Sequence, residues 1–272
     1  PMLASLASRR FKSSGATQGV PIAMINFLRK GAGPGLYAHH LQQRAEELGY
    51  NLSVIKDYEL AHYSNPSKTL YNRGVQGLII VGPVADSAFR SDFEWDEFSV
   101  VQCGRFFEPL NFDTVRPNIF QSIKQAYQRC KKAGYRRIGF ALGHHDTILE
   151  DDESRLSAVL GIQQIEVPEC ERIPPFFDTL QDATKLIGWA RQHRPDCVIG
   201  FHIGLCGALL KAGLKIPEEI GFASLHLTGP QTLGDSRNLS IAGNDQNLEE
   251  IARQSMNVID QSIRHPIRGT PS

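Results

Sequence analysis

Nine histidines and a run of acidic residues are the side chains in this sequence that could perform acid–base or metal chemistry. Two histidine pairs occur, His39-His40 and His144-His145, but no HExxH motif, GxSxG motif or suitably spaced carboxylate pair accompanies them. The acidic residues 150–153 begin a predicted helix, where the helix dipole favours negative charge, so capping explains them better than metal binding. Catalysis is therefore not indicated.

The cysteines and a glycine-rich loop give no sharper chemical signal. The five cysteines are an odd number without a CxxC pair, which argues against a disulfide framework or a zinc site and favours a reducing cytoplasm. The glycine-rich residues 31–35 lack the GxGxxG pattern and the later acidic residue that dinucleotide binding requires. We expect no cofactor, no metal ion and no enzymatic activity.

Composition limits the possible partners. The 29 basic and 29 acidic residues cancel, whereas a free-standing nucleic-acid binder usually carries a basic surplus. No apolar run reaches the roughly 18 residues that can span a bilayer. The N-terminal segment places apolar residues before basic ones, the reverse of a secretory signal. We therefore expect a soluble, cytoplasmic protein that does not contact a membrane.

Short apolar runs alternate with helical patterns, and this alternation predicts how the candidate residues are positioned. Alternating strands and helices favour a parallel sheet covered on both faces, and two successive series favour two lobes. The first series has strands at 22–27, 51–56, 77–82 and 98–103, with helices at 36–48, 65–73 and 86–93. The second has helices at 118–133, 152–164, 180–193 and 203–212, with strands at 137–142, 169–174, 197–201 and 220–225, and a helix at 248–264 follows.

Residues directly after each strand are binding candidates, because ligands of open parallel sheets lie beyond the carboxyl ends of the strands. Asn26 stands at the carboxyl end of the first predicted strand and is such a candidate. Arg105 follows the strand that ends at Cys103 and could add a cationic contact.

Three segments resemble those of the LacI/GalR transcription regulators, in order along nearly the whole chain. They are LYNRGVQGLIIVGP at 70–83, KKAGYRRIGFAL at 131–142 and LKAGLKIPEEIGFASL at 210–225. The resemblance implies an α/β protein with two doubly wound parallel-sheet lobes, type I periplasmic-binding-protein-like, and a ligand cleft between them. It implies the effector-binding core of a regulator, in which closure on a sugar or related metabolite controls operator binding. An extracytoplasmic solute-binding protein of a transporter is the alternative.

The first residues, PMLASLASRR, resemble the family's hinge, in which Leu3 or Leu6 would wedge into the DNA minor groove. A frayed terminus is the alternative. The family's DNA-binding headpiece is absent, so operator DNA is expected only through the headpiece and hinge, and the family's pairing implies a homodimer that uses helices near residues 65–93. The expected domains are a hinge-like segment and linker at 1–19, an N-terminal lobe at 20–117 plus about 245–265, and a C-terminal lobe at 118–228 whose final strand is missing.

The resemblance also implies effector contacts. Tyr37 matches an aromatic that stacks on the ligand, although core packing explains it equally well. Arg155 matches an arginine that donates paired hydrogen bonds to the effector, and its planar fork suits hydroxyls or a carboxylate. An exposed helix arginine is the alternative. Asn118 stands where the family usually has aspartate.

Two departures from the family pattern concern the second lobe. His202 replaces an Asn-Asp pair and His226 replaces an aspartate, so the usual sugar-binding carboxylates are lost. The two imidazoles could hydrogen-bond as neutral groups, bind an anion when protonated, or serve only the structure. Asp245 is the acidic candidate that remains near the expected cleft.

Overall fold

A computed structural model describes residues 19–27, 35–60, 62–82, 93–103, 112–144, 148–179, 183–227, 232–233 and 239–265. The chain divides into two compact units, of which the first comprises Pro1–Arg116 with Leu248–Ser272 and the second Pro117–Asn247. Leu3, Leu6, Arg105 and residues 86–92 of the helix expected near 86–93 lie outside the described residues. Within the described residues, no helix is both long enough and apolar enough to cross a bilayer.

The first unit is built on a parallel sheet with strand order β2-β1-β3-β4-β5. Alternate side chains of β1 belong to two different buried clusters, Ile22 and Met24 to one and Ala23 and Ile25 to the other. Successive side chains of a strand point to opposite faces, so both faces of this sheet are covered. The strands are β1 (Val20–Asn26), β2 (Tyr50–Lys56), β3 (Gly77–Val81), β4 (Ser99–Cys103) and β5 (Asp113–Val115), and the helices are α2 (Gly35–Leu48), α3 (Asp57–Leu60), α4 (Pro66–Asn72), η2 (Trp95–Glu97) and α9 (Leu248–Arg264).

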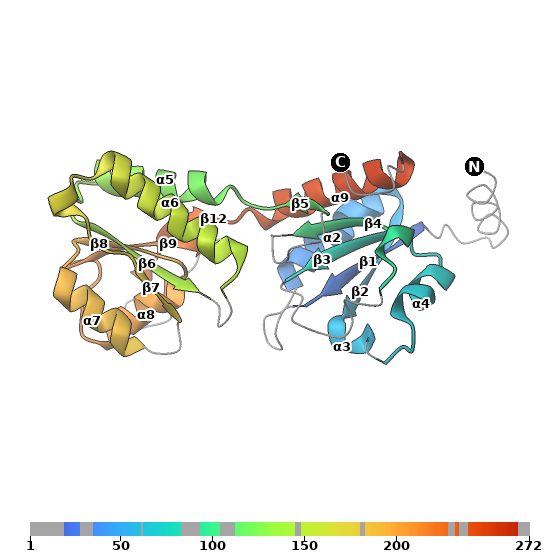
Figure 1. Ribbon diagram of the computed structural model, residues 1–272, viewed down its shortest axis with the longest axis horizontal. Coiled ribbons are helices and arrows are strands. Elements are labelled where there is room, and N and C mark those ends of the chain that lie inside the picture. Colours follow the sequence, from blue (N-terminus) through green and yellow to red (C-terminus); the bar gives the residue numbers. More distant parts are fainter. Residues whose placement is uncertain are drawn as a thin grey trace. The chain divides into compact units, whose positions relative to one another are not determined.

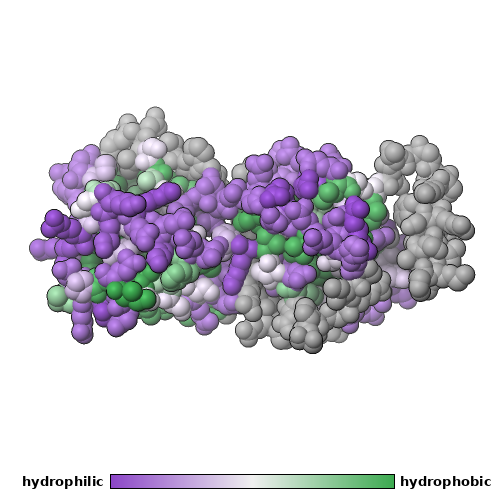
Figure 2. Space-filling model, turned by 90° about the horizontal axis from the view of Figure 1, so that it is seen from above, coloured by the Kyte–Doolittle hydropathy of each residue, from purple (hydrophilic) through white to green (hydrophobic). Residues whose placement is uncertain are grey.

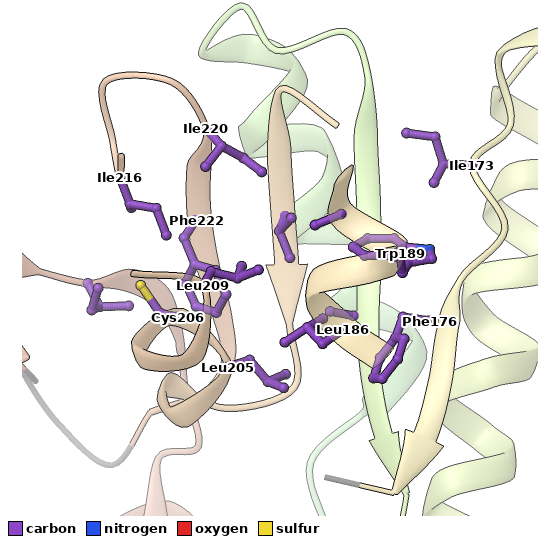
Figure 3. Close-up of a cluster of buried hydrophobic side chains, with 14 of the residues drawn as sticks. Ile173, Phe176, Leu186, Trp189, Leu205, Cys206, Leu209, Ile216, Ile220 and Phe222 are labelled. Atoms are coloured by element: carbon purple, nitrogen blue, oxygen red, sulfur yellow. The ribbon is translucent and has the colours of Figure 1, made fainter. Parts of the chain in front are cut away.

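The second unit repeats this plan with strand order β12-β9-β8-β6-β7. Figure 1 shows α5 and α6 on one face of its sheet and α7 and α8 on the other. The core on the α7 and α8 side is drawn in Figure 3, where Trp189 and Leu209 pack against the strands. The strands are β6 (Ile138–His144), β7 (Phe176–Thr179), β8 (Cys197–Gly200), β9 (Gly221–Leu227), β10 (Thr232–Leu233), β11 (Leu239–Ser240) and β12 (Ala242–Asp245), and the helices are α5 (Ile119–Lys132), α6 (Glu150–Glu166), η3 (Glu169–Glu171), α7 (Ala183–His193) and α8 (Ile203–Lys211).

The prediction of an α/β protein with two doubly wound parallel sheets is thus confirmed. In the face of the molecule seen in Figure 2, hydrophilic side chains predominate. Most apolar residues of both sheets are instead enclosed by the helices, as parallel strands require.

Two predicted boundaries in the second unit differ from the structure. The strand expected at 169–174 is wrong, because residues 169–171 form η3 and pairing with β6 begins only at Phe176. Prolines at 174 and 175 have no N–H to donate to a sheet, which explains the late start. The second lobe was expected to end near residue 228, but the second unit runs to Asn247 because β12 pairs in parallel with β9.

Phe140 tests the core of the second unit, since it is a fully buried side chain at the centre of β6. Phe140→Ala should lower the free energy of unfolding by about 3–5 kcal/mol, because a large aromatic leaves a cavity that its neighbours fill only in part. Trp189 fluorescence in a Trp95→Phe background reports urea unfolding of this unit alone. Ile165→Ala, at a side chain that is 82% exposed, is the control and should change stability by less than about 0.5 kcal/mol. Equal losses would contradict the assignment of the core.

Candidate functional site

Four side chains gather where the second sheet presents the carboxyl ends of its strands. We call this group, Arg155, Phe201, His202 and His226, the Phe201 cluster. The Cζ atom of Arg155 lies 3.9 Å from the centroid of the Phe201 ring. The rings of His202 and His226 each lie 5.8 Å from that ring, centroid to centroid. Phe201 follows β8 directly and His226 is in β9, the neighbouring parallel strand, so sheet topology brings them together.

Arg155 is held from within its own helix. It lies on α6 with only 7% of its surface exposed, and its Nη2 donates to the carboxylate of Asp152, which is fully buried one turn earlier. Asp152 also accepts the backbone N–H of Leu149 at 2.9 Å, so the same carboxylate caps the helix. Burial lowers the pKa of Arg155, and the negative charge of Asp152 opposes that change. Arg155 stays charged, as guanidinium groups do in proteins. Its burial excludes the alternative of an exposed helix arginine.

Phe201 was missed by the sequence analysis, which assigned it to the preceding strand. In the structure β8 ends at Gly200, and Phe201 places its ring beneath the guanidinium of Arg155. A cation over an aromatic face is attracted to it, and the attraction grows where water is excluded. The signal in the sequence was the position itself, directly before His202 at a strand end.

His202 has a definite tautomer because it caps a helix. It is the N-cap residue of α8, and its Nδ1 accepts the backbone N–H of Gly204 at 2.9 Å. An accepting Nδ1 carries no proton, so the neutral ring carries its proton on Nε2 and can donate from there. Burial lowers the pKa of His202, which favours this neutral form at pH 7.

His226 is also neutral at pH 7, for a partly different reason. Although part of its side chain is exposed, desolvation by the surrounding chain is the main cause that lowers its pKa. The positive charge of Arg155, and that of His202 when it is protonated, act in the same direction. The cluster thus combines one permanent cation with two uncharged imidazoles that can donate or accept hydrogen bonds.

The remaining candidates of the second unit support backbone turns. Asn118 is the exposed N-cap of α5, where its side chain accepts the N–H of Gln121 at 3.0 Å. Asp245 ends β12, and its carboxylate accepts the N–H of Asn247 at 2.8 Å. Asn247 has a φ of 50°, so this bond stabilises a left-handed residue.

The first unit contains the other two described candidates. Asn26 ends β1 and is buried. Tyr37 lies in the core, and its hydroxyl is 2.6 Å from the Cys103 sulfur and 3.1 Å from the Ser255 oxygen. Burial raises the pKa of Tyr37. This placement favours the core-packing alternative for Tyr37 over stacking on a ligand.

No group of three or more histidine, cysteine or acidic side chains within the described ranges is arranged to hold a metal ion. Arg155, His202 and His226 are the predicted residues that the structure brings together.

Comparison with solved structures shows which known proteins share this fold. A putative ribose operon repressor from Burkholderia thailandensis is 16% identical, with 94% of this chain and 96% of that chain covered and a TM-score of 0.69. The fold is that of LacI-type regulators. A LacI family regulator from Enterococcus faecium with bound ribose is 14% identical, covers 92% of both chains and gives a TM-score of 0.64.

The transcriptional regulator CelR in complex with cellobiose is a further structural match of the LacI-type fold. It is 15% identical, with 96% of this chain and 83% of that chain covered and a TM-score of 0.69. No protein-family model and no curated protein matches the chain. At these identities the likeness establishes the architecture, and the chemistry must be argued from this chain's own residues.

Tyr37→Phe separates a role in the core from a role in binding. Loss of the buried hydroxyl should lower the free energy of unfolding by about 1 kcal/mol, because its hydrogen bonds to Cys103 and Ser255 disappear. Affinity for a ligand of the Phe201 cluster should stay within twofold. Urea unfolding and calorimetry measure the two quantities, and a tenfold loss of affinity in a stable variant would return Tyr37 to the binding site.

Proposed function

We propose that this chain is the effector-binding core of a LacI/GalR-type DNA-binding transcription regulator. The observation that carries the proposal is the Phe201 cluster, a charged guanidinium and two neutral imidazoles at the carboxyl edge of a doubly wound sheet. This edge is where such sheets bind ligands. Solved neighbours of the same fold are described with ribose and cellobiose, which supports a sugar or related metabolite as effector.

Arg155 is the proposed principal contact. Asp152 and the Phe201 ring hold its guanidinium, so Arg155 loses little conformational entropy when a ligand binds to it. His202 can donate through Nε2, and His226 can donate or accept. Arg155 and the two histidines can hydrogen-bond to the hydroxyls of a sugar, so the site needs no carboxylate. This explains how histidines can replace the acidic residues that the family has at these positions.

The proposal includes the regulatory step as well as the binding site. An effector that binds one arrangement of the two units better than another would shift their equilibrium. Operator DNA would be contacted through a headpiece and the hinge-like segment that contains Leu3 and Leu6, and a homodimer would transmit the change. The proposed role is that of a sensor rather than an enzyme, and the solved structures that share the fold are described as a putative repressor and a transcriptional regulator.

The state of the cysteines favours this role over an extracytoplasmic solute-binding protein. All five are free thiols, and four of them are buried. The sulfur atoms of Cys130 and Cys197 lie 3.6 Å apart as a hydrogen-bonded pair without a covalent link. Disulfides are typical of exported proteins, whereas free thiols persist in a reducing compartment.

A thermal-shift screen of sugars, sugar phosphates, nucleosides and small acids identifies the effector, because a ligand bound by the folded state raises the Tm. Arg155→Ala should then weaken binding of the best hit by roughly ten- to a hundredfold, the value of hydrogen bonds to a charged donor. Arg155→Lys should rescue little, because it loses the planar fork. Calorimetry measures these affinities, and Arg129→Ala on the exposed face of α5 is the control.

Arg155→Ala also breaks the ion pair of the buried Asp152 carboxylate, which lowers the stability of the unit. The double variant Asp152→Asn with Arg155→Met removes both charges together and avoids that cost. A folded double variant that binds the hit within twofold of the parent would remove Arg155 from the site.

The two histidines make stability depend on pH in a defined direction. Their pKa values in the folded protein are lowered, so below about pH 6.5 the unfolded chain takes up protons more readily. Their contribution to stability is complete above that pH and is lost as the pH falls. The free energy of unfolding should therefore drop between pH 7 and pH 5.5, and less so in the double variant His202→Asn with His226→Gln, in which asparagine retains the N-cap.

Urea titrations of parent and variant at the two pH values measure this difference. Identical pH dependence would contradict the assignment of neutral histidines. Effector affinity should decline over the same range if the ligand contacts neutral imidazoles, whereas affinity that rises on acidification would identify an anionic effector held by protonated rings.

A further inference from the structure

A pocket of about 100 Å³ lies in the second unit beside His202. Its walls come from β7, α7 and α8, on the face of the sheet opposite α5 and α6. Phe176, Leu186 and Leu205 are three of the lining residues, and Figure 3 shows them together at the end of the core toward which the strands point. The pocket therefore opens at the carboxyl edge of the sheet, the edge that also holds the Phe201 cluster.

The lining of the pocket favours an apolar occupant. Besides the three large apolar side chains it includes Ala183 and Ala208, while Thr179 and His202 are its polar side chains. A bound water needs two to four polar partners, and an engineered cavity of about 150 Å³ with apolar walls stays dry and takes benzene. The pocket here is about 100 Å³ and partly open rather than enclosed, so it offers less space than that cavity and suits a short alkyl group.

His202 belongs to both places. It lines the pocket, and its ring lies 5.8 Å from that of Phe201 in the cluster. Its Nδ1 accepts the N–H of Gly204, which holds the ring in this position. One small molecule can therefore place a polar part against the cluster and an attached apolar part in the pocket.

We propose that the pocket is a specificity subsite for a short apolar substituent of the effector. The effector would then be a hydroxylated molecule that carries a short alkyl group, rather than an unsubstituted sugar. This inference rests on the proposed function, because the Phe201 cluster must bind the polar part. The pocket would discriminate between effectors with and without the substituent, because each buried methylene strengthens binding by about fourfold.

The pocket itself can be tested before the effector is known, with xenon as the probe. Xenon should shift the methyl NMR signals of Leu186 and Leu205 in the parent protein, because these side chains line the pocket. Ala208→Leu adds three carbon atoms to one wall and should abolish the shifts. Ala133→Leu makes the same change at the exposed end of α5 and should leave them intact. Absence of the shifts in the parent would overturn the proposal.

The second arm uses matched pairs of compounds from the thermal-shift screen, each hit with and without a methyl to butyl substituent. Calorimetry should show tighter binding by about fourfold per methylene in the parent and in Ala133→Leu. Ala208→Leu, and Ala183→Leu on the α7 wall as a second filling variant, should lose that gain while they bind the unsubstituted compound as the parent does. An unchanged gain in both filling variants overturns the subsite.

The two proposals fail in different ways. If Arg155 variants lose binding but alkyl substituents bring no gain in the parent, the subsite is wrong and the proposed function stands. If no compound binds, or if binding survives the Asp152→Asn with Arg155→Met change, the Phe201 cluster is not the site and both proposals fall, whatever xenon shows.

Discussion

A guanidinium removed from water needs a partner, and in the second unit Asp152 is that partner for Arg155. The pair lies within one turn of α6, where the carboxylate also caps the helix start. Because Asp152 is fully buried, rotating Arg155 away would break an ion pair in the interior, where the loss of one partner is costly. The position of the cation, and with it the Phe201 cluster, therefore depends on this ion pair.

Burial sets the state of the two imidazoles beside the cation. It is the largest cause that lowers the pKa of His226, to which the positive charges of a protonated His202 and of Arg155 add, and it is the cause that lowers the pKa of His202. A site with one compensated cation and two neutral imidazoles repels neither hydroxyls nor small apolar groups. These properties, with the adjoining pocket, are the basis of the proposal that the effector is polar without being strongly charged and carries an alkyl group.

Sheet topology explains why these residues meet. β6, β8 and β9 are adjacent and parallel, so their carboxyl ends share one edge. Helix α6 follows β6 and places Arg155 at this edge. Helix α8 follows β8, and its N-cap residue His202 lies at the same edge. The first unit has the same plan, but there Tyr37 is used to pack α2 against β4 and α9 through hydrogen bonds to Cys103 and Ser255. Equivalent architecture thus carries different chemistry in the two units.

The sequence by itself determined the α/β class, the two parallel sheets and most helices, because short apolar runs and helical apolar spacing are local features of the chain. It also selected Arg155, His202 and His226. It missed β12 and the late start of β7, since short strands acquire their place only by pairing with a neighbour. Phe201 beneath Arg155, the core position of Tyr37 and the pocket beside His202 were decided by tertiary structure, because each depends on contacts between residues far apart in the chain, which no local pattern encodes.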